Sequence, residues 1–82
     1  MEKTTKQRKP ERREIGRVTL REGEDLILTL VDQEKLDIRV WMDTQRYKGP
    51  TKRGVRFYIY DEIWPKVFEL FKTFNDEYEK LD

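Results

Sequence analysis

Residues 35–60, KLDIRVWMDTQRYKGPTKRGVRFYIY, decide the fold because they hold two alternating segments joined by a basic loop. In residues 36–42 the even positions are apolar and the odd positions are Asp37, Arg39 and Trp41. In residues 55–60 the odd positions are apolar, and Arg56 and Tyr58 occupy even ones. A period of two is typical of strands that bury one face. The stretch therefore predicts two strands, with a basic, aromatic side opposite an apolar one.

Two further strands are predicted before this stretch, over residues 15–21 (IGRVTLR) and 25–31 (DLILTLV). Glu22, Gly23 and Glu24 form a turn signal between them, and residues 32–34 turn the chain again. Residues 42–54 contain a Gly-Pro pair and a second glycine, which favours a long loop. Four strands with mostly short turns predict an antiparallel meander. Its polar face gathers Arg17 and Arg21 with the basic and aromatic residues named above.

A helix is predicted over residues 62–81, with Asp61 as its N-cap. Its apolar side chains are too many for one stripe and form two rows. We expect one row to cover the apolar face of the sheet and the second to form a partner surface. The residues expected at a homodimer interface are Trp64, Phe68, Phe71 and Tyr78. The predicted fold is α+β, with order β-β-β-β-α.

The chain has 82 residues, which indicates one domain. Residues 1–14 carry six basic and three acidic side chains and are predicted to be a disordered basic tail, leaving residues 15–82 as the folded domain. Cysteine and histidine are absent, so disulfides and the commonest zinc ligands are excluded. A small domain that has neither disulfides nor a structural metal is often stabilised by oligomerisation, which we therefore expect here. No segment is apolar enough to predict a membrane span or a signal peptide, and we expect an intracellular protein.

The formal net charge of +1 conceals a segregated distribution. Residues 46–60 hold five basic and no acidic side chains, whereas residues 61–82 hold three basic and seven acidic ones. Cations beside exposed rings suit single-stranded nucleic acid, because cations neutralise phosphates and rings stack on unpaired bases. The expected phosphate contacts are Arg17, Arg21, Lys35, Arg39, Arg46, Lys48, Lys52, Arg53 and Arg56. The expected stacking residues are Trp41, Tyr47 and Tyr58.

Catalysis is not predicted. Neither histidine nor cysteine is available as a base or nucleophile. The carboxylates of residues 61–82 fit solvated helix faces better than a metal site, and residues 49–54 lack the ending of a phosphate-binding loop. We therefore expect a binding protein that needs no cofactor or metal.

The order of several short motifs resembles the positive cofactor four family of transcriptional coactivators. The motifs are Ile15-Gly16-Arg17, Asp37-Ile38-Arg39, Trp41-Met42-Asp43, Lys48 with Pro50, Lys52-Arg53-Gly54-Val55, and the early helix tryptophan Trp64. The resemblance covers about residues 15–81. It implies an intertwined homodimer whose basic, aromatic-lined sheets bind single-stranded or melted DNA with little sequence preference. By position it assigns Arg39, Trp41, Lys52, Arg53 and Gly54 to the family pattern.

The chain also departs from that family. Residues 30–34 lack the aromatic and the lysines that many members carry in the second turn, so Lys35 is the one cation near it. Arg56 stands where a small polar residue is common. Three readings of the polar face remain open at this point: DNA binding, RNA binding through the same residues, and an ordinary wet sheet surface on a protein-interaction adaptor for transcription machinery.

Overall fold

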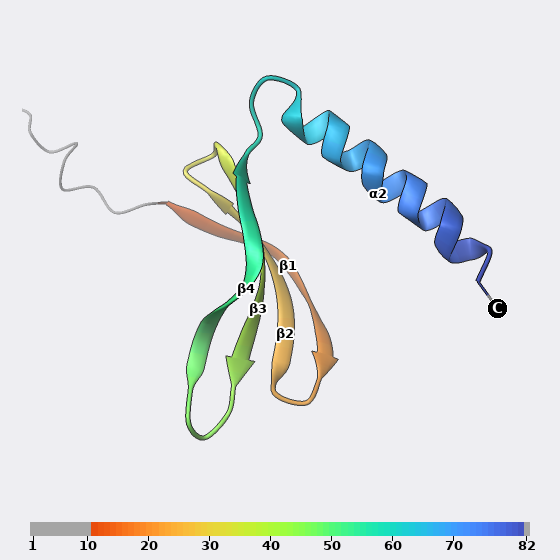
Figure 1. The fold of residues 1–82 in the computed structure, drawn as a ribbon. Helices are drawn as coiled ribbons and strands as arrows, with labels where there is room; N and C mark the ends of the chain where they lie inside the picture. Colours follow the sequence, from red (N-terminus) through yellow and green to blue (C-terminus); the bar gives the residue numbers. More distant parts are fainter. Residues whose placement is uncertain (1–10, 82) are drawn as a thin grey trace, which may run out of the picture.

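A computed structural model of the chain describes residues 11–81. Its elements are the strands β1 (Arg12–Arg21), β2 (Glu24–Val31), β3 (Lys35–Asp43) and β4 (Lys48–Tyr58), followed by the helix α2 (Ile63–Glu79) (Figure 1). The predicted α+β class and β-β-β-β-α order are confirmed. Arg12 to Glu14, which we expected in the N-terminal tail, form the start of β1. Glu11 is also described, and its amide donates to the Asp32 carboxylate at 2.8 Å. Residues 1–10 of the predicted tail lie outside the described part.

The four strands form one antiparallel sheet in the order β1-β2-β3-β4. The first two hairpin turns use left-handed backbone, which matches the twist of the sheet. Gly23 has φ 83° between β1 and β2, and Asp32 and Gln33 have φ 55° and 58° between β2 and β3. The predicted meander is therefore confirmed, with β1 and β4 as its edges.

The edge strands contain irregularities that the alternation of the sequence does not reveal. β1 shifts register between Thr19 and Arg21, so that Arg21 pairs with Glu24. In β4, Gly54 and Pro50 pair with Arg39 and Trp41, so four positions along β4 oppose two along β3. The predicted loop over residues 42–54 is wrong, because β4 begins at Lys48 and absorbs these extra residues as a bulge.

The sheet has two unlike faces, here called the charged face and the apolar face. The cross-strand rows of the charged face are Thr19, Asp25, Trp41 and Pro50; Arg17, Ile27, Arg39 and Gly54; Glu14, Thr29, Asp37 and Arg56; and Arg12, Val31, Lys35 and Tyr58. Ile27 and Val31 are each 2% exposed on this face. Both have an arginine directly opposite on β1, so aliphatic stems of long side chains account for part of this burial.

The apolar face consists of Val18, Leu26, Leu28, Leu30, Leu36, Ile38, Val40, Val55 and Phe57. Leu36 and Val40 are buried there, but the three leucines of β2 are only half-buried and Val18 and Val55 are exposed. An antiparallel sheet normally packs one such face against another layer. Within residues 11–81 of the single chain, no other element covers the apolar face.

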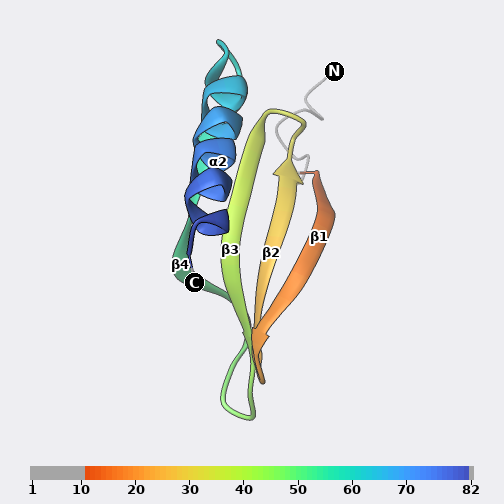
Figure 2. The ribbon, with the colours of Figure 1, turned by 90° about the vertical axis from the view of Figure 1, so that its right-hand side faces the viewer.

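The helix does not supply that layer. None of the residues of α2 is buried, and within residues 11–81 the closely packed element pairs are the three pairs of adjacent strands. Figure 1 shows α2 leaving the end of β4 and standing clear of the sheet, although the two overlap in the projection of Figure 2. The radius of gyration is 16.1 Å, whereas a compact chain of this length has ~12 Å. The expectation that the helix covers its own sheet is wrong for the single chain.

The connection between β4 and α2 directs the helix outward. Asp61 and Glu62 both lie in the left-handed region, with φ 57° and 64°. Glu62 occupies the N-cap position and makes no side-chain capping bond, so the predicted Asp61 N-cap is wrong. Non-glycine residues adopt this backbone at a cost, and here no strand pairing across a hairpin accounts for it. Within residues 11–81 no helix has the length and hydropathy to cross a membrane.

Candidate nucleic-acid interface

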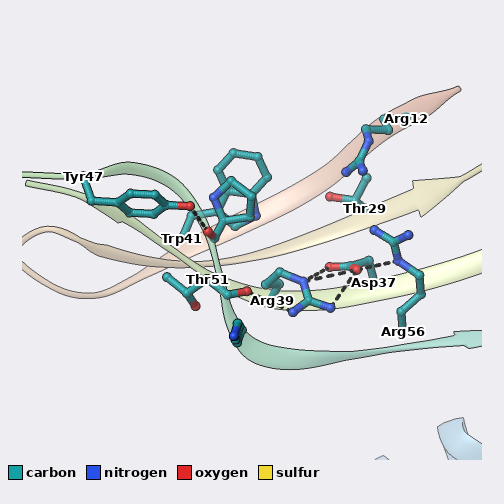
Figure 3. A pocket seen from close by; sticks show the side chains of 10 residues that line it. Arg12, Thr29, Asp37, Arg39, Trp41, Tyr47, Thr51 and Arg56 are labelled. Atoms are coloured by element: carbon teal, nitrogen blue, oxygen red, sulfur yellow. Dashed lines mark hydrogen bonds and ion pairs between the residues drawn. The ribbon is translucent and has the colours of Figure 1, made fainter. Parts of the chain in front are cut away.

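A groove of about 510 Å³ opens on the charged face, here called the basic groove. Its lining residues are Arg12, Thr29, Asp37, Arg39, Trp41, Tyr47, Pro50, Thr51, Lys52 and Arg56. Four of these side chains are cationic and one is anionic. In Figure 3 the two aromatic side chains lie toward one end, Arg12 and Arg56 toward the other, and Asp37 with Arg39 between them. The groove therefore combines positive charge with exposed ring surface along one path.

Asp37 is the centre of the polar network in this groove. It is 3% exposed, and its carboxylate accepts hydrogen bonds from Arg39 Nε at 3.0 Å and Arg56 Nε at 2.8 Å. Burial alone would raise the pKa of Asp37, but the hydrogen bonds from Arg39 and Arg56 hold that pKa below its ordinary value. Asp37 is therefore ionised at neutral pH and binds both guanidinium groups.

The bulge of β4 places backbone and side-chain groups around Arg39. Arg39 Nη1 donates to the carbonyl oxygen of Thr51 at 3.0 Å. The Thr51 hydroxyl donates to the Val40 carbonyl at 2.7 Å and accepts from the Arg53 amide at 3.1 Å, which ties the bulge to β3. Arg39 is consequently held on both sides, by Asp37 along its own strand and by Thr51 across the ladder.

Gly54 allows this close approach of β4 to Arg39. A Cβ atom at Gly54 would lie 2.4 Å from the Ile38 carbonyl oxygen and 2.7 Å from Arg39 Cα, both of which are backbone atoms that cannot rotate away. Glycine is thus required here by space and not by φ. By contrast, a Cβ atom at Gly16 would meet no atom within 4 Å.

We expect Gly54→Ala to lower the free energy of unfolding by ~2 kcal/mol or more, because the added methyl group forces β3 and β4 apart. Denaturant titration followed by circular dichroism measures this change. Gly16→Ala is the matched control, and its expected effect is below ~1 kcal/mol. Equal stability of Gly54→Ala and the wild type would show that the β3–β4 register adapts freely at the bulge.

Two rings form the aromatic end of the groove. Trp41 is half-buried on β3, with Asp25 and Pro50 as its cross-strand neighbours. Tyr47 lies in the β3–β4 turn, and its hydroxyl donates to the Pro50 carbonyl (Figure 3). That hydrogen bond fixes the orientation of the phenol ring. A planar group that enters the groove can therefore contact a Tyr47 ring whose orientation is already restricted.

A second and larger groove, of about 660 Å³, adjoins the first and shares Trp41 with it. Its charged lining side chains are Arg17 and Lys48 with Glu22, Asp25 and Asp43, so acids outnumber bases. Arg17 is also bound by Glu14 at 2.8 Å and Asp25 at 3.1 Å. A polyanion is repelled by this composition, so the smaller basic groove is the better candidate site despite its size.

The structure brings five of the predicted binding residues together in the basic groove: Arg39, Trp41, Tyr47, Lys52 and Arg56. Lys35 and Tyr58 lie at one end of the charged face, with Lys35 Nζ 5.2 Å from the centre of the Tyr58 ring. Arg17 and Lys48 line the second, larger groove, in which acids outnumber bases. Arg46 is exposed in the β3–β4 turn. These last five residues surround the groove but do not line it.

Arg21 and Arg53 are placed on the opposite side of the sheet. Both bind Glu24, at 3.2 Å and 3.1 Å, and Glu24 shares the parity of Leu26 on the apolar face. The expectation that Arg21 lies on the polar face is wrong, because the β1 register shift reverses its side. Arg21 and Arg53 therefore lie outside the basic groove, on the other side of the sheet.

Five residues that line the groove are missing from the predicted binding set: Arg12, Thr29, Asp37, Pro50 and Thr51. The sequence places Arg12 in the tail, because residues 12–14 contain no apolar side chain that would indicate a strand. Asp37 shares the parity of Arg39 and Trp41, which predicts its place on the charged face, but a carboxylate does not by itself indicate an anion site. Thr51 faces the groove through the bulge, which the alternation does not reveal.

Comparisons of the chain with models of protein families, with curated proteins and with solved structures found no match.

Proposed function

We propose that this protein binds single-stranded DNA with little sequence preference and acts, without catalysis, as a transcriptional coactivator or regulator. The observation that carries the proposal is the basic groove, where Arg12, Arg39, Lys52 and Arg56 stand beside Trp41 on one face. The resemblance of residues 15–81 to the positive cofactor four family supports the same role.

A single strand fits this groove better than a duplex. Trp41 presents its indole within the groove, and an unpaired base can stack on it, whereas the bases of a duplex are already stacked on one another. Except for Arg12 and Lys52, the cations of the groove have a carboxylate partner among residues 11–81. Because Arg39 and Arg56 already share the Asp37 carboxylate, we expect moderate affinity, and the phosphate contacts make that affinity salt-dependent.

We further propose that the active form is a homodimer. Each protomer leaves two apolar surfaces without a covering layer, one on the sheet and one on α2. The exposed large side chains of the helix include Phe68, Phe71, Phe74 and Tyr78. A second copy offers a helix for the uncovered sheet and a sheet for the uncovered helix, so a two-fold exchange covers both surfaces at once. Trp64, which packs against Phe68 and Phe71, anchors this surface.

Binding of a fluorescent ~20-nucleotide single strand, measured by anisotropy at two salt concentrations, tests the proposed function. We expect the slope of log K against log salt to be near −2 to −3, since about four groove cations each release ~0.7 counterion. A matching duplex should compete poorly, and a matching RNA strand reports the preference between DNA and RNA. Absence of binding at low salt would indicate that the charged face is an ordinary solvent-exposed sheet surface. It would favour the alternative function, a protein-interaction adaptor for transcription machinery.

A further inference from the structure

Asp37 is a carboxylate at the centre of a groove assigned to a polyanion, which requires an explanation. At 3% exposed it is the most buried charged side chain among residues 11–81. A buried charge costs free energy unless it is paired, and Asp37 is paired with both Arg39 and Arg56. If the groove needed only positive charge, a neutral side chain at this position would serve it better.

The geometry of the pairs shows what the carboxylate does to each guanidinium. Arg56 donates to Asp37 through Nε, and no hydrogen bond occupies its two Nη groups within residues 11–81. Arg39 donates to Asp37 through Nε and Nη2, and its Nη1 is taken by Thr51. Every guanidinium nitrogen of Arg39 thus makes a hydrogen bond, whereas Arg56 is held through Nε alone and both of its Nη groups are open.

The open edge of Arg56 faces the groove beside Thr29 and Arg12 (Figure 3). Thr29 and Asp37 are its row neighbours on the sheet, and Arg12 stands in the next row of β1. A guanidinium with two free Nη groups matches two oxygens of a phosphate, provided its plane is fixed. Since the Arg56 side chain is about one-third exposed at 37%, packing alone does not fix that plane.

We propose that Asp37 is a positioning residue for nucleic-acid binding, which fixes Arg56 and Arg39 so that the outer edge of Arg56, with Arg12, receives a backbone phosphate. The inference rests on the proposed binding of single-stranded DNA and adds a site for one phosphate within it. The carboxylate itself does not touch the phosphate. It stabilises one orientation of Arg56 that would otherwise be one of many rotamers.

Asp37→Asn tests this inference, because positioning and simple charge predict opposite signs. Removing a negative charge from the groove should tighten binding of an oligothymidylate of ~20 nucleotides if charge alone matters. If Asp37 positions Arg56, binding should weaken about tenfold in spite of the added net positive charge. The slope of log K against log salt should also become shallower by ~0.7 as one phosphate contact is lost.

Asp25→Asn is the matched control. Asp25 lies on the same face and makes an ion pair with Arg17, but Arg17 keeps two hydrogen bonds to Glu14 when Asp25 is neutral. This variant should bind at least as tightly as the wild type, with an unchanged slope. Equal or tighter binding by folded Asp37→Asn, in parallel with Asp25→Asn, would overturn the positioning role while leaving the proposed function intact.

Arg56→Lys keeps the inference testable if Asp37→Asn does not fold. Lysine retains the charge but cannot be held at one edge while presenting two donors in a plane. We expect binding about fivefold or more weaker with circular dichroism unchanged, whereas wild-type affinity for Arg56→Lys would overturn the inference. Absence of binding by the wild type in the same assay would overturn both the proposed function and the role of Asp37.

Discussion

Phe71→Glu should abolish the homodimer. Phe71 is 48% exposed on α2, packs edge-on against Trp64, and belongs to the surface proposed to meet a second copy. Burying a glutamate there leaves a charge without a partner, so we expect dissociation of the dimer to become easier by about 30-fold or more, equivalent to ~2 kcal/mol. Size-exclusion chromatography with light scattering at micromolar concentration should give the mass of two chains for the wild type and of one chain for the variant.

Thr73→Glu provides the control for that experiment. It adds the same charge to the same helix, but position 73 is about 200° around the helix from position 71 and lies in the polar row with Glu69 and Lys66. This variant should remain dimeric. If Phe71→Glu remained dimeric, the helix would not form the interface. The apolar face of the sheet would then be the next surface to test.

Trp41→Ala should weaken binding of single-stranded DNA by about tenfold or more, since a stacked base contributes ~1–3 kcal/mol. The anisotropy assay with a ~20-nucleotide strand measures the loss. Trp41 is only half-buried, so we expect the variant to fold, and circular dichroism checks that it does. The salt slope should be unchanged, because a ring releases no counterions.

Trp41→Phe tests whether binding requires an aromatic ring at this position. Phenylalanine keeps a flat face at the same place, so its affinity should lie within about threefold of the wild type. An unaltered affinity in folded Trp41→Ala would contradict the stacking role and leave phosphate contacts as the whole of the binding energy.

Regular alternation is the part of the structure that the sequence predicts well. In β2 and β3 every residue keeps the face that its parity assigns, so Asp37, Arg39 and Trp41 share the charged face as expected. These two strands are central and pair on both sides without a register shift between them. A slip there would turn leucines to the wrong face, and this cost keeps their register regular.

The edge strands are less predictable because a bulge reverses parity without a compositional signal. Arg21 changes face after the shift in β1, and Arg53 meets Glu24 on the apolar side beside the bulge of β4. The bulge of β4 is held by a contact between residues distant in sequence, the hydrogen bond from the Thr51 hydroxyl to the Val40 carbonyl. A single sequence shows the residues of such a contact but not their pairing.

The position of the helix also could not be predicted. Its apolar rows indicate that α2 has something to cover, but they do not identify which sheet. That choice depends on the left-handed backbone at Asp61 and Glu62, and neither residue type signals such a conformation as glycine does. The apolar pattern predicted the existence and length of the helix, whereas the connection determined its direction.

The outward direction of α2 has a consequence for how the protein folds. The sheet can form within one chain, because each hairpin joins neighbouring segments. The helix of a homodimer with exchanged surfaces gains its burial only when two chains meet, so that step is bimolecular. The melting temperature should then rise with protein concentration. Dilution would loosen the helices first and leave the basic groove, which lies wholly on the sheet and its turn, formed in each separated chain.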